Sequence, residues 1–168
     1  MQDTDYLNKL GPLALASRLR RLLQRLNADG ERIYRDLGID VKPKWFPVMR
    51  ILSEQSPLAL TDIARLMSLT HPSLIETVNE LISVGLIDSR KSDLDGRRRE
   101  LSLTDKGKRF CKKLVPVWEA FRLAGEEVNK DCGNDFLDAL GKFEQSLERR
   151  PMYNRVMVQL GVGSGRKK

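Results

Sequence analysis

The sequence is poor in the residue types that build metal centres and hydrolytic active sites. It contains one histidine, His71, and two cysteines, Cys111 and Cys132, among 168 residues. A zinc site needs several histidines or cysteines at ligand spacing, and a serine–histidine–acid relay needs a histidine beside a nucleophile. We therefore predict no metal, no cofactor and no catalytic residue, and we interpret the chain as a protein that is not an enzyme.

Long apolar runs and a secretion signal are also missing. No stretch approaches the roughly 20 apolar residues that cross a bilayer, and the N-terminus has no basic start followed by an apolar core. Two cysteines without a framework pattern suit a reducing compartment. We expect a cytoplasmic protein that has no membrane partner.

The two cysteines leave two interpretations open. Arg109, Lys112 and Lys113 lie close to Cys111 in the sequence, and neighbouring positive charge lowers the pKa of a thiol, as an oxidant sensor requires. The alternative is that Cys111 and Cys132 are ordinary structural thiols.

Positive charge is abundant but unevenly distributed. The chain has 30 lysines and arginines against 23 acids, which gives a formal net charge of +7. Residues 84–113 carry ten bases and five acids, and the tail from residue 149 carries six bases and no acid. Residues 114–148 carry only three bases and eight acids. Such local excess attracts a phosphate backbone, although it also occurs on surfaces that are simply solvated.

Residues 60–84 have the pattern of two short helices joined by a tight turn. Apolar residues recur at i, i+3, i+4 and i+7 from Leu60 to Met67, which predicts an amphipathic helix over 60–67. Residues 68–70 form the predicted turn. Thr70 is placed to cap a second helix that starts near His71, with Pro72 in its first turn.

The second helix is predicted to bury one stripe and expose another. The buried stripe comprises Leu74, Val78, Leu81 and Ile82. The outward positions are Ser73, Glu76, Thr77 and Glu80, with His71 and Pro72 at the tip. A helix of this kind fits the major groove of DNA, where hydroxyl groups can donate or accept and a carboxylate can accept from cytosine. We therefore assign His71, Pro72, Ser73, Glu76 and Thr77 as candidate DNA-binding residues.

A β-hairpin is predicted next. Gly85 ends the second helix, residues 86–91 and 99–103 form two strands around Asp95-Gly96, and Thr104 caps a third helix. Arg97 and Arg98 at the hairpin tip suit a narrow minor groove, and Asp95 is placed to hold the guanidinium of Arg97. These three residues and Lys91 complete the DNA-binding candidates. The alternative is a solvated tip without such a role.

Three segments outside this module repeat apolar residues about every 3.5 positions, which is typical of helices that pack lengthwise against other helices. We predict that they form a homodimer, and the alternative is an intramolecular bundle. Pro116 is expected to kink or restart the helix that contains it. The residues assigned to dimerisation are Leu15, Leu19, Leu22, Phe121, Phe136, Leu140 and Phe143.

These motifs together resemble the MarR family of bacterial transcriptional regulators. The resemblance lies in residues 101–107 preceded by Asp95-Gly96-Arg97, and it extends to residues 10–13 and 45–48, so that it covers roughly residues 7–150. It implies a homodimer on a pseudo-palindromic operator, with a small-molecule effector in many members. It also implies an effector pocket near Tyr34, Trp45, Phe46 and Met49, for which ordinary core positions are the alternative.

We predict a mainly α fold with a small β-hairpin wing (α+β), a winged helix-turn-helix with N- and C-terminal dimerisation helices. Its parts are a dimerisation helix over 1–38, a DNA-binding lobe over 44–107, dimerisation helices over 108–160 and a disordered basic tail over 161–168. The predicted function is that of a sequence-specific transcriptional regulator, a repressor, that binds double-stranded DNA as a homodimer. The alternative is a winged-helix module that binds a protein or RNA.

Overall fold

The computed structural model describes residues 5–68, 71–91 and 99–162, and for residues 71–73 and 91 it describes the backbone alone. Contacts between residues divide the chain into two compact units, Met1–Lys112 and Lys113–Lys168. Helix α6 (Asp105–Asp131) begins in the first unit and ends in the second. None of the helices within the described ranges has the length and apolar character needed to cross a membrane.

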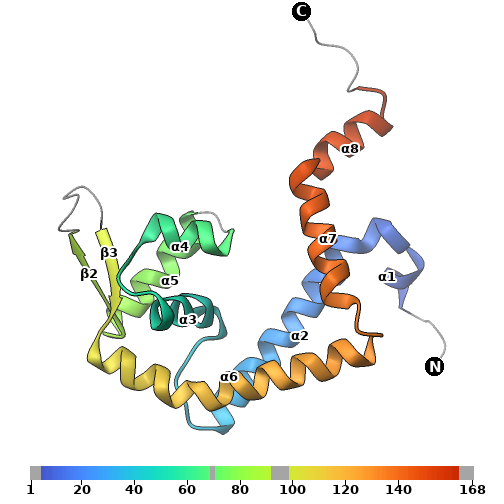
Figure 1. The fold of residues 1–168 in the computed structure, drawn as a ribbon. Coiled ribbons are helices and arrows are strands. Elements are labelled where there is room, and N and C mark those ends of the chain that lie inside the picture. Colours follow the sequence, from blue (N-terminus) through green and yellow to red (C-terminus); the bar gives the residue numbers. More distant parts are fainter. Residues whose placement is uncertain (1–4, 69–70, 92–98, 163–168) are drawn as a thin grey trace, which may run out of the picture. The chain divides into compact units, whose positions relative to one another are not determined.

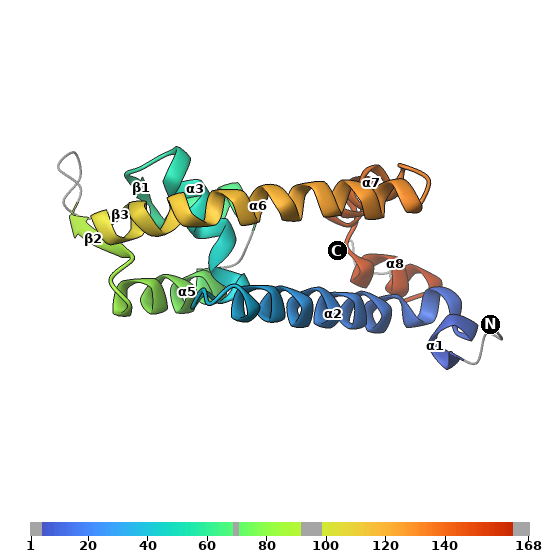
Figure 2. The same cartoon turned by 90° about the horizontal axis from the view of Figure 1, so that it is seen from below.

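The first unit begins with helical segments. The short helix α1 (Tyr6–Lys9) and the 3₁₀ turn η1 (Gly11–Ala14) lead into α2 (Leu15–Asp36). Figure 2 shows α2 as one uninterrupted helix, and its 22 residues span about 33 Å at 1.5 Å per residue. Gly38 follows its end with a φ of 66°, the left-handed conformation that glycine adopts readily. The helix ends two residues before the predicted limit at residue 38.

Apart from the start of α6, the rest of the first unit is a lobe in which α-helices pack with a small sheet (Figure 1). Its elements are η2 (Pro43–Trp45), α3 (Phe46–Glu54), β1 (Leu58–Ala59), α4 (Leu60–Met67), α5 (His71–Ser83), β2 (Ile87–Lys91) and β3 (Arg99–Leu103). This arrangement confirms the predicted mainly α fold with a hairpin. Strand β1 is an addition to the prediction, because two residues are too few to show the alternation of a strand.

The sheet closes the lobe in the order β1-β3-β2, and both pairs of strands are antiparallel. Its register places Leu58 opposite Leu101 and Ile87 opposite Leu103. Helix α3 contacts α4 and β3, while α5 contacts α4 and β2. The fully buried side chains of this core are Val48, Met49, Leu52, Ile63, Leu74, Leu81 and Ile87.

A close contact joins the sheet to α6. Thr104 caps α6 as predicted, because its Oγ1 accepts a hydrogen bond from the Gly107 N–H at 3.0 Å. The same hydroxyl donates to the carbonyl oxygen of Gly85 at 2.7 Å. A Cβ atom on Gly107 would lie 2.0 Å from the carbonyl oxygen of Leu86, so this approach requires glycine.

The second unit contains the remainder of α6, α7 (Phe136–Arg149) and α8 (Met152–Gln159). Helix α6 continues through Pro116, so of the two expected effects, a kink or a restart of the helix, the restart does not occur. Proline removes one hydrogen bond of the ladder, and the neighbouring bonds maintain the helix here. The guanidinium of Arg155 donates to the carbonyl oxygen and the Oγ of Ser146, which ties α8 to α7.

Candidate nucleic-acid interface

Helix α5 is the second helix of the helix-turn-helix, and its buried face differs from the predicted one. Leu74, Val78 and Leu81 are buried as predicted. Thr77 is only 7 % exposed, whereas Ile82 is 38 % exposed. The buried stripe therefore runs through positions 74, 77, 78 and 81, which is the i, i+3, i+4, i+7 arc of one helix face. The prediction that Thr77 faces outward to read bases is wrong, and so is the placement of Ile82 in the core.

The exposed face of α5 carries Ile75, Glu76 and Asn79. Asparagine can form a two-pronged contact with adenine, and an apolar side chain can pack on the methyl group of thymine. Ile75 and Asn79 are absent from the sequence-based prediction. That prediction chose Thr77 and Glu80 as outward positions, whereas the exposed positions are 75, two residues before Thr77, and 79, one residue before Glu80. Their i, i+4 spacing beside Glu76 is the signal that could have found them.

Several of the predicted DNA-binding residues have no described side chain, and others lie outside the described residues. His71, Pro72 and Ser73 lie in the first turn of α5, and Lys91 ends β2. Their side chains are outside the description, as are residues Thr70, Asp95, Arg97 and Arg98 entirely. The DNA-binding roles of these residues stay predictions.

The described part of the hairpin concentrates basic residues toward its tip. The register places Arg90 opposite Glu100 and Lys91 opposite Arg99. Arg90 donates to Asp88 at 2.9 Å, and this bond is the main reason why the pKa of Asp88 lies below its usual value. The backbone register thus pairs two basic sequence positions, 91 and 99, next to the end of the described strands.

A cluster of five residues, the η2–α5 cluster, joins α5 to the segment before α3. It consists of Lys42, Lys44, Trp45, Glu76 and Glu80. Lys44 Nζ lies 2.8 Å from Oε1 of Glu76 and 2.8 Å from Oε1 of Glu80. Oε2 of Glu80 accepts from the indole Nε1 of Trp45 at 2.8 Å and lies 3.2 Å from Lys42 Nζ. Glu80 is thus bonded within the protein, and the prediction that it faces outward is wrong.

The charges of this cluster stabilise one another. The hydrogen bond from Lys44, followed by that from Trp45, lowers the pKa of Glu80 to about 2. The bonds to Glu76 and Glu80 raise the pKa of Lys44 in turn. Lys42 also lies 5.8 Å from the ring centroid of Trp45, within the range of a cation–π contact. Both pKa shifts favour the charged forms of Glu80 and Lys44.

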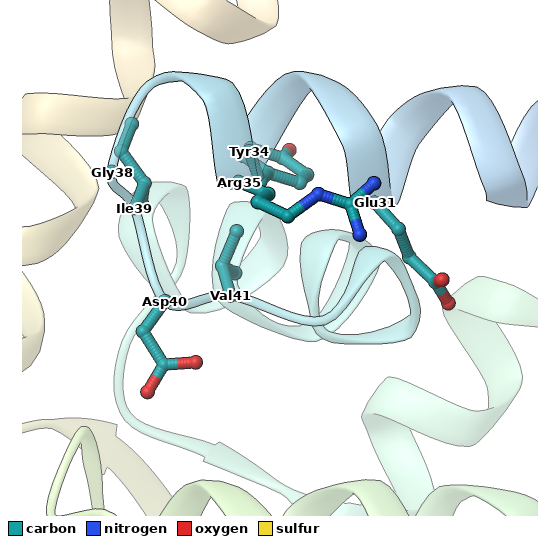
Figure 3. A pocket seen from close by; sticks show the side chains of 7 residues that line it. All are labelled: Glu31, Tyr34, Arg35, Gly38, Ile39, Asp40 and Val41. Carbon is teal, nitrogen blue, oxygen red and sulfur yellow. The ribbon is translucent and has the colours of Figure 1, made fainter.

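Two open cavities border the segment between α2 and α3. The first has a volume of about 340 Å³ and is formed at the bend after α2 (Figure 3). Its lining residues are Glu31, Tyr34, Arg35, Gly38, Ile39, Asp40 and Val41. The second has a volume of about 430 Å³. Its lining residues are Leu23, Asn27, Glu31, Lys42, Pro43, Lys44 and Pro47.

Of the four residues predicted to surround an effector pocket, Tyr34 alone lines either of these two cavities. Trp45 and Met49 are buried in the core of the lobe, at 4 % and 0 % exposure. Phe46 is 41 % exposed at the start of α3. The second cavity is therefore lined by Lys42 and Lys44 and by none of the four predicted residues.

Cys111 does not have the environment of a sensor thiol. It is buried, and burial raises the pKa of its thiol, with Arg50 opposing the shift more weakly. Of the two interpretations left open for Cys111, this direction of the pKa shift favours an ordinary structural thiol, because desolvation outweighs the nearby positive charge. Cys132 is exposed. Within the described residues, no group of three histidine, cysteine or acidic side chains is placed to hold a metal ion.

The apolar residues assigned to dimerisation are largely accessible on the single chain. Leu19 and Leu22 on α2 are 40 % and 45 % exposed, and Phe121 and Phe136 are 37 % and 44 % exposed. Leu15, Leu140 and Phe143 are half-buried. Apolar side chains in this number at the surface of helices are typical of an interface.

Two consecutive helices, α4 and α5, followed by two antiparallel strands of which β3 also pairs with the short strand β1, define a winged helix-turn-helix. Residues 39–98 also match the sequence model of the MarR family. The chain is therefore similar to MarR-family regulators over these residues, in agreement with the resemblance found in its motifs.

Comparison with solved structures supports the same fold. The transcriptional repressor CouR, bound to a 23-mer DNA duplex, is 26 % identical with a TM-score of 0.62, and the match covers 80 % of this chain and 96 % of that one. MepR of S. aureus in complex with DNA is 17 % identical with a TM-score of 0.63, covering 76 % and 96 %. BpsR of Bordetella bronchiseptica, whose DNA binding is regulated by 6-hydroxynicotinic acid, is 20 % identical with a TM-score of 0.56, covering 67 % and 83 %. A comparison with curated proteins finds no match.

Proposed function

We propose that this protein is a transcriptional repressor that binds double-stranded DNA as a homodimer in the cytoplasm. The observation that carries the proposal is a winged helix-turn-helix whose second helix presents Ile75, Glu76 and Asn79 on an exposed face. The DNA complexes of CouR and MepR, which share the fold, support it. A DNA regulator needs no catalytic residue, so the proposal also agrees with a protein that is not an enzyme.

In this proposal α5 enters the major groove and the hairpin contacts the minor groove beside it. Asn79 and Ile75 supply base contacts, together with the predicted contacts of Pro72 and Ser73. Arg97 and Arg98 supply positive charge to the minor groove, and the opposed pair Lys91 and Arg99 extends that charge along the strands.

Dimerisation would provide two such modules for two half-sites of a pseudo-palindromic operator. The exposed Leu19 and Leu22 on α2 and the exposed Phe121 and Phe136 support an interface between two copies.

The proposal includes a small-molecule effector with an acidic group. The second cavity supports it, because Lys42 and Lys44 line that cavity and also belong to the η2–α5 cluster. An aromatic carboxylic acid, the chemical class of the acid that regulates BpsR, would bring its carboxylate to these lysines. Such binding would raise the melting temperature of the protein and weaken its complex with DNA, whereas no shift with any acid tested would contradict it.

Replacement of two wing arginines tests DNA binding. Each phosphate that a protein neutralises contributes about 0.9 to the slope of log affinity against log salt. We expect the double variant Arg97→Ala/Arg98→Ala to flatten that slope by about 1–2 units or more, measured by fluorescence anisotropy on a duplex selected from genomic DNA.

The control is Arg149→Ala/Arg150→Ala, which removes the same charge from the second unit and should leave the slope closer to the wild-type value. A wild-type protein that selects no duplex, or a wing variant with unchanged slope and affinity, would favour a winged helix that binds a protein or RNA instead.

A further inference from the structure

Helix α5 has no positive charge of its own. Between His71 and Ser83 the sequence contains two acids, Glu76 and Glu80, and no lysine or arginine. The Glu76 side chain is 70 % exposed on the same face as Asn79. If this face approaches DNA, an uncompensated carboxylate would be repelled by the phosphates, and such repulsion is costly at an interface.

Lysines from outside the helix-turn-helix supply the missing charge. Lys44, which belongs to η2, places one ammonium group 2.8 Å from a carboxylate oxygen of each acid. Lys42 adds a second ammonium group 3.2 Å from Glu80. Two positive charges thus match two negative charges, so the η2–α5 cluster is neutral.

The geometry of the cluster also leaves part of Glu76 available. Lys44 and Trp45 occupy both oxygens of Glu80, but Lys44 contacts only Oε1 of Glu76. Among the five residues of the cluster, none bonds to Oε2 of Glu76, and a carboxylate oxygen can accept from the amino group of cytosine. Lys44 therefore fixes Glu76 while leaving an acceptor on the exposed face of α5.

We propose that Lys44 is a positioning residue for DNA binding: it cancels the negative charge of α5 and holds Glu76 in place, without itself contacting DNA. This inference rests on the proposed function. The competing explanation is that Lys44 binds a phosphate directly. The two differ in one respect, because only the positioning role depends on the presence of the acids.

A double-mutant cycle separates them. We compare Lys44→Met in the wild-type background and in the Glu76→Gln/Glu80→Gln background, using a duplex that the wild-type protein selects. In the wild-type background Lys44→Met should weaken binding about tenfold or more, because it leaves the exposed Glu76 without a positive partner in the cluster and Glu80 with Lys42 alone. In the background without acids it should change affinity less than about threefold. Lys44→Arg, which keeps the charge, should bind within about threefold of wild type.

The unfolding midpoint in urea, measured for every variant, distinguishes positioning from folding. Exposed ion pairs contribute little to stability, so the midpoints should be nearly equal, and the amide oxygen introduced by Glu80→Gln can still accept from the indole of Trp45. Lys142→Met on α7 is the matched control and should bind like wild type. Equal losses from Lys44→Met in both backgrounds, or no loss in either, would overturn the inference. Absence of any duplex bound by the wild-type protein would instead refute the proposed function.

Discussion

At the scale of single residues, the junction between the sheet and α6 requires a glycine at position 107. Gly107 lies so close to the backbone of Leu86 that a methyl group has no space. Gly125 lies in the same helix, and a Cβ atom there would meet nothing within 4 Å. The two glycines therefore form a natural pair for comparing a required glycine with a replaceable one.

We expect Gly107→Ala to lower the free energy of unfolding by about 1–3 kcal/mol or more, because the clash is with backbone that cannot rotate away. Gly125→Ala should instead raise it by about 0.5–1 kcal/mol, since alanine favours a helix. Chemical denaturation at one protein concentration measures both. A harmless Gly107→Ala would show that the contact between α6 and Leu86 can open without cost.

At the scale of elements, helix α5 carries one polar residue that packs in the core and another that is a candidate for base contacts. Thr77 is buried and Asn79 is exposed, although both are polar residues of the same helix. The Thr77 side chain packs in the buried stripe of α5. The Asn79 side chain is exposed and can contact DNA when α5 enters the major groove.

Thr77→Ala is predicted to destabilise the lobe by about 0.5–3 kcal/mol, the usual cost of altering a packed position. Asn79→Ala should leave the melting temperature nearly unchanged and lower the preference for selected over random duplex by about 1–3 kcal/mol. Thermal unfolding and competition binding measure the two effects. If Asn79→Ala weakens selected and random duplexes equally, Asn79 does not read bases.

At the scale of the whole molecule, the proposed dimer depends on apolar side chains that the single chain leaves exposed. Leu19 and Leu22 lie on α2, and arginine at these positions would place charge in an interface. Leu19→Arg/Leu22→Arg should yield a monomer by light scattering at micromolar concentration, with helical circular dichroism retained. Leu66→Arg on α4, which is 52 % exposed on the lobe, is the control and should remain dimeric. A wild-type protein of monomeric mass would contradict the homodimer.

The spacing of apolar residues and the local turn and capping residues were sufficient to predict most elements of the winged helix-turn-helix. The bounds of α4, the start of α5, both strands of the hairpin and the cap at Thr104 follow from helical spacing, turn residues and capping chemistry, all of which act over a few neighbouring residues. The resemblance carried by residues 101–107 likewise depends on a short motif. The sequence alone thus determined the fold class and the resemblance to the MarR family.

Only the tertiary structure decided which polar residues of α5 are available. Glu80 is held by Lys44 and Trp45, which lie 36 and 35 residues away in the sequence. Thr77 is buried on the face of α5 that packs in the lobe. The same holds for Cys111, whose thiol pKa is raised by burial while its sequence neighbours suggested the opposite shift. Burial and ion pairing depend on which segments meet in space, and helical period within one segment does not contain that information.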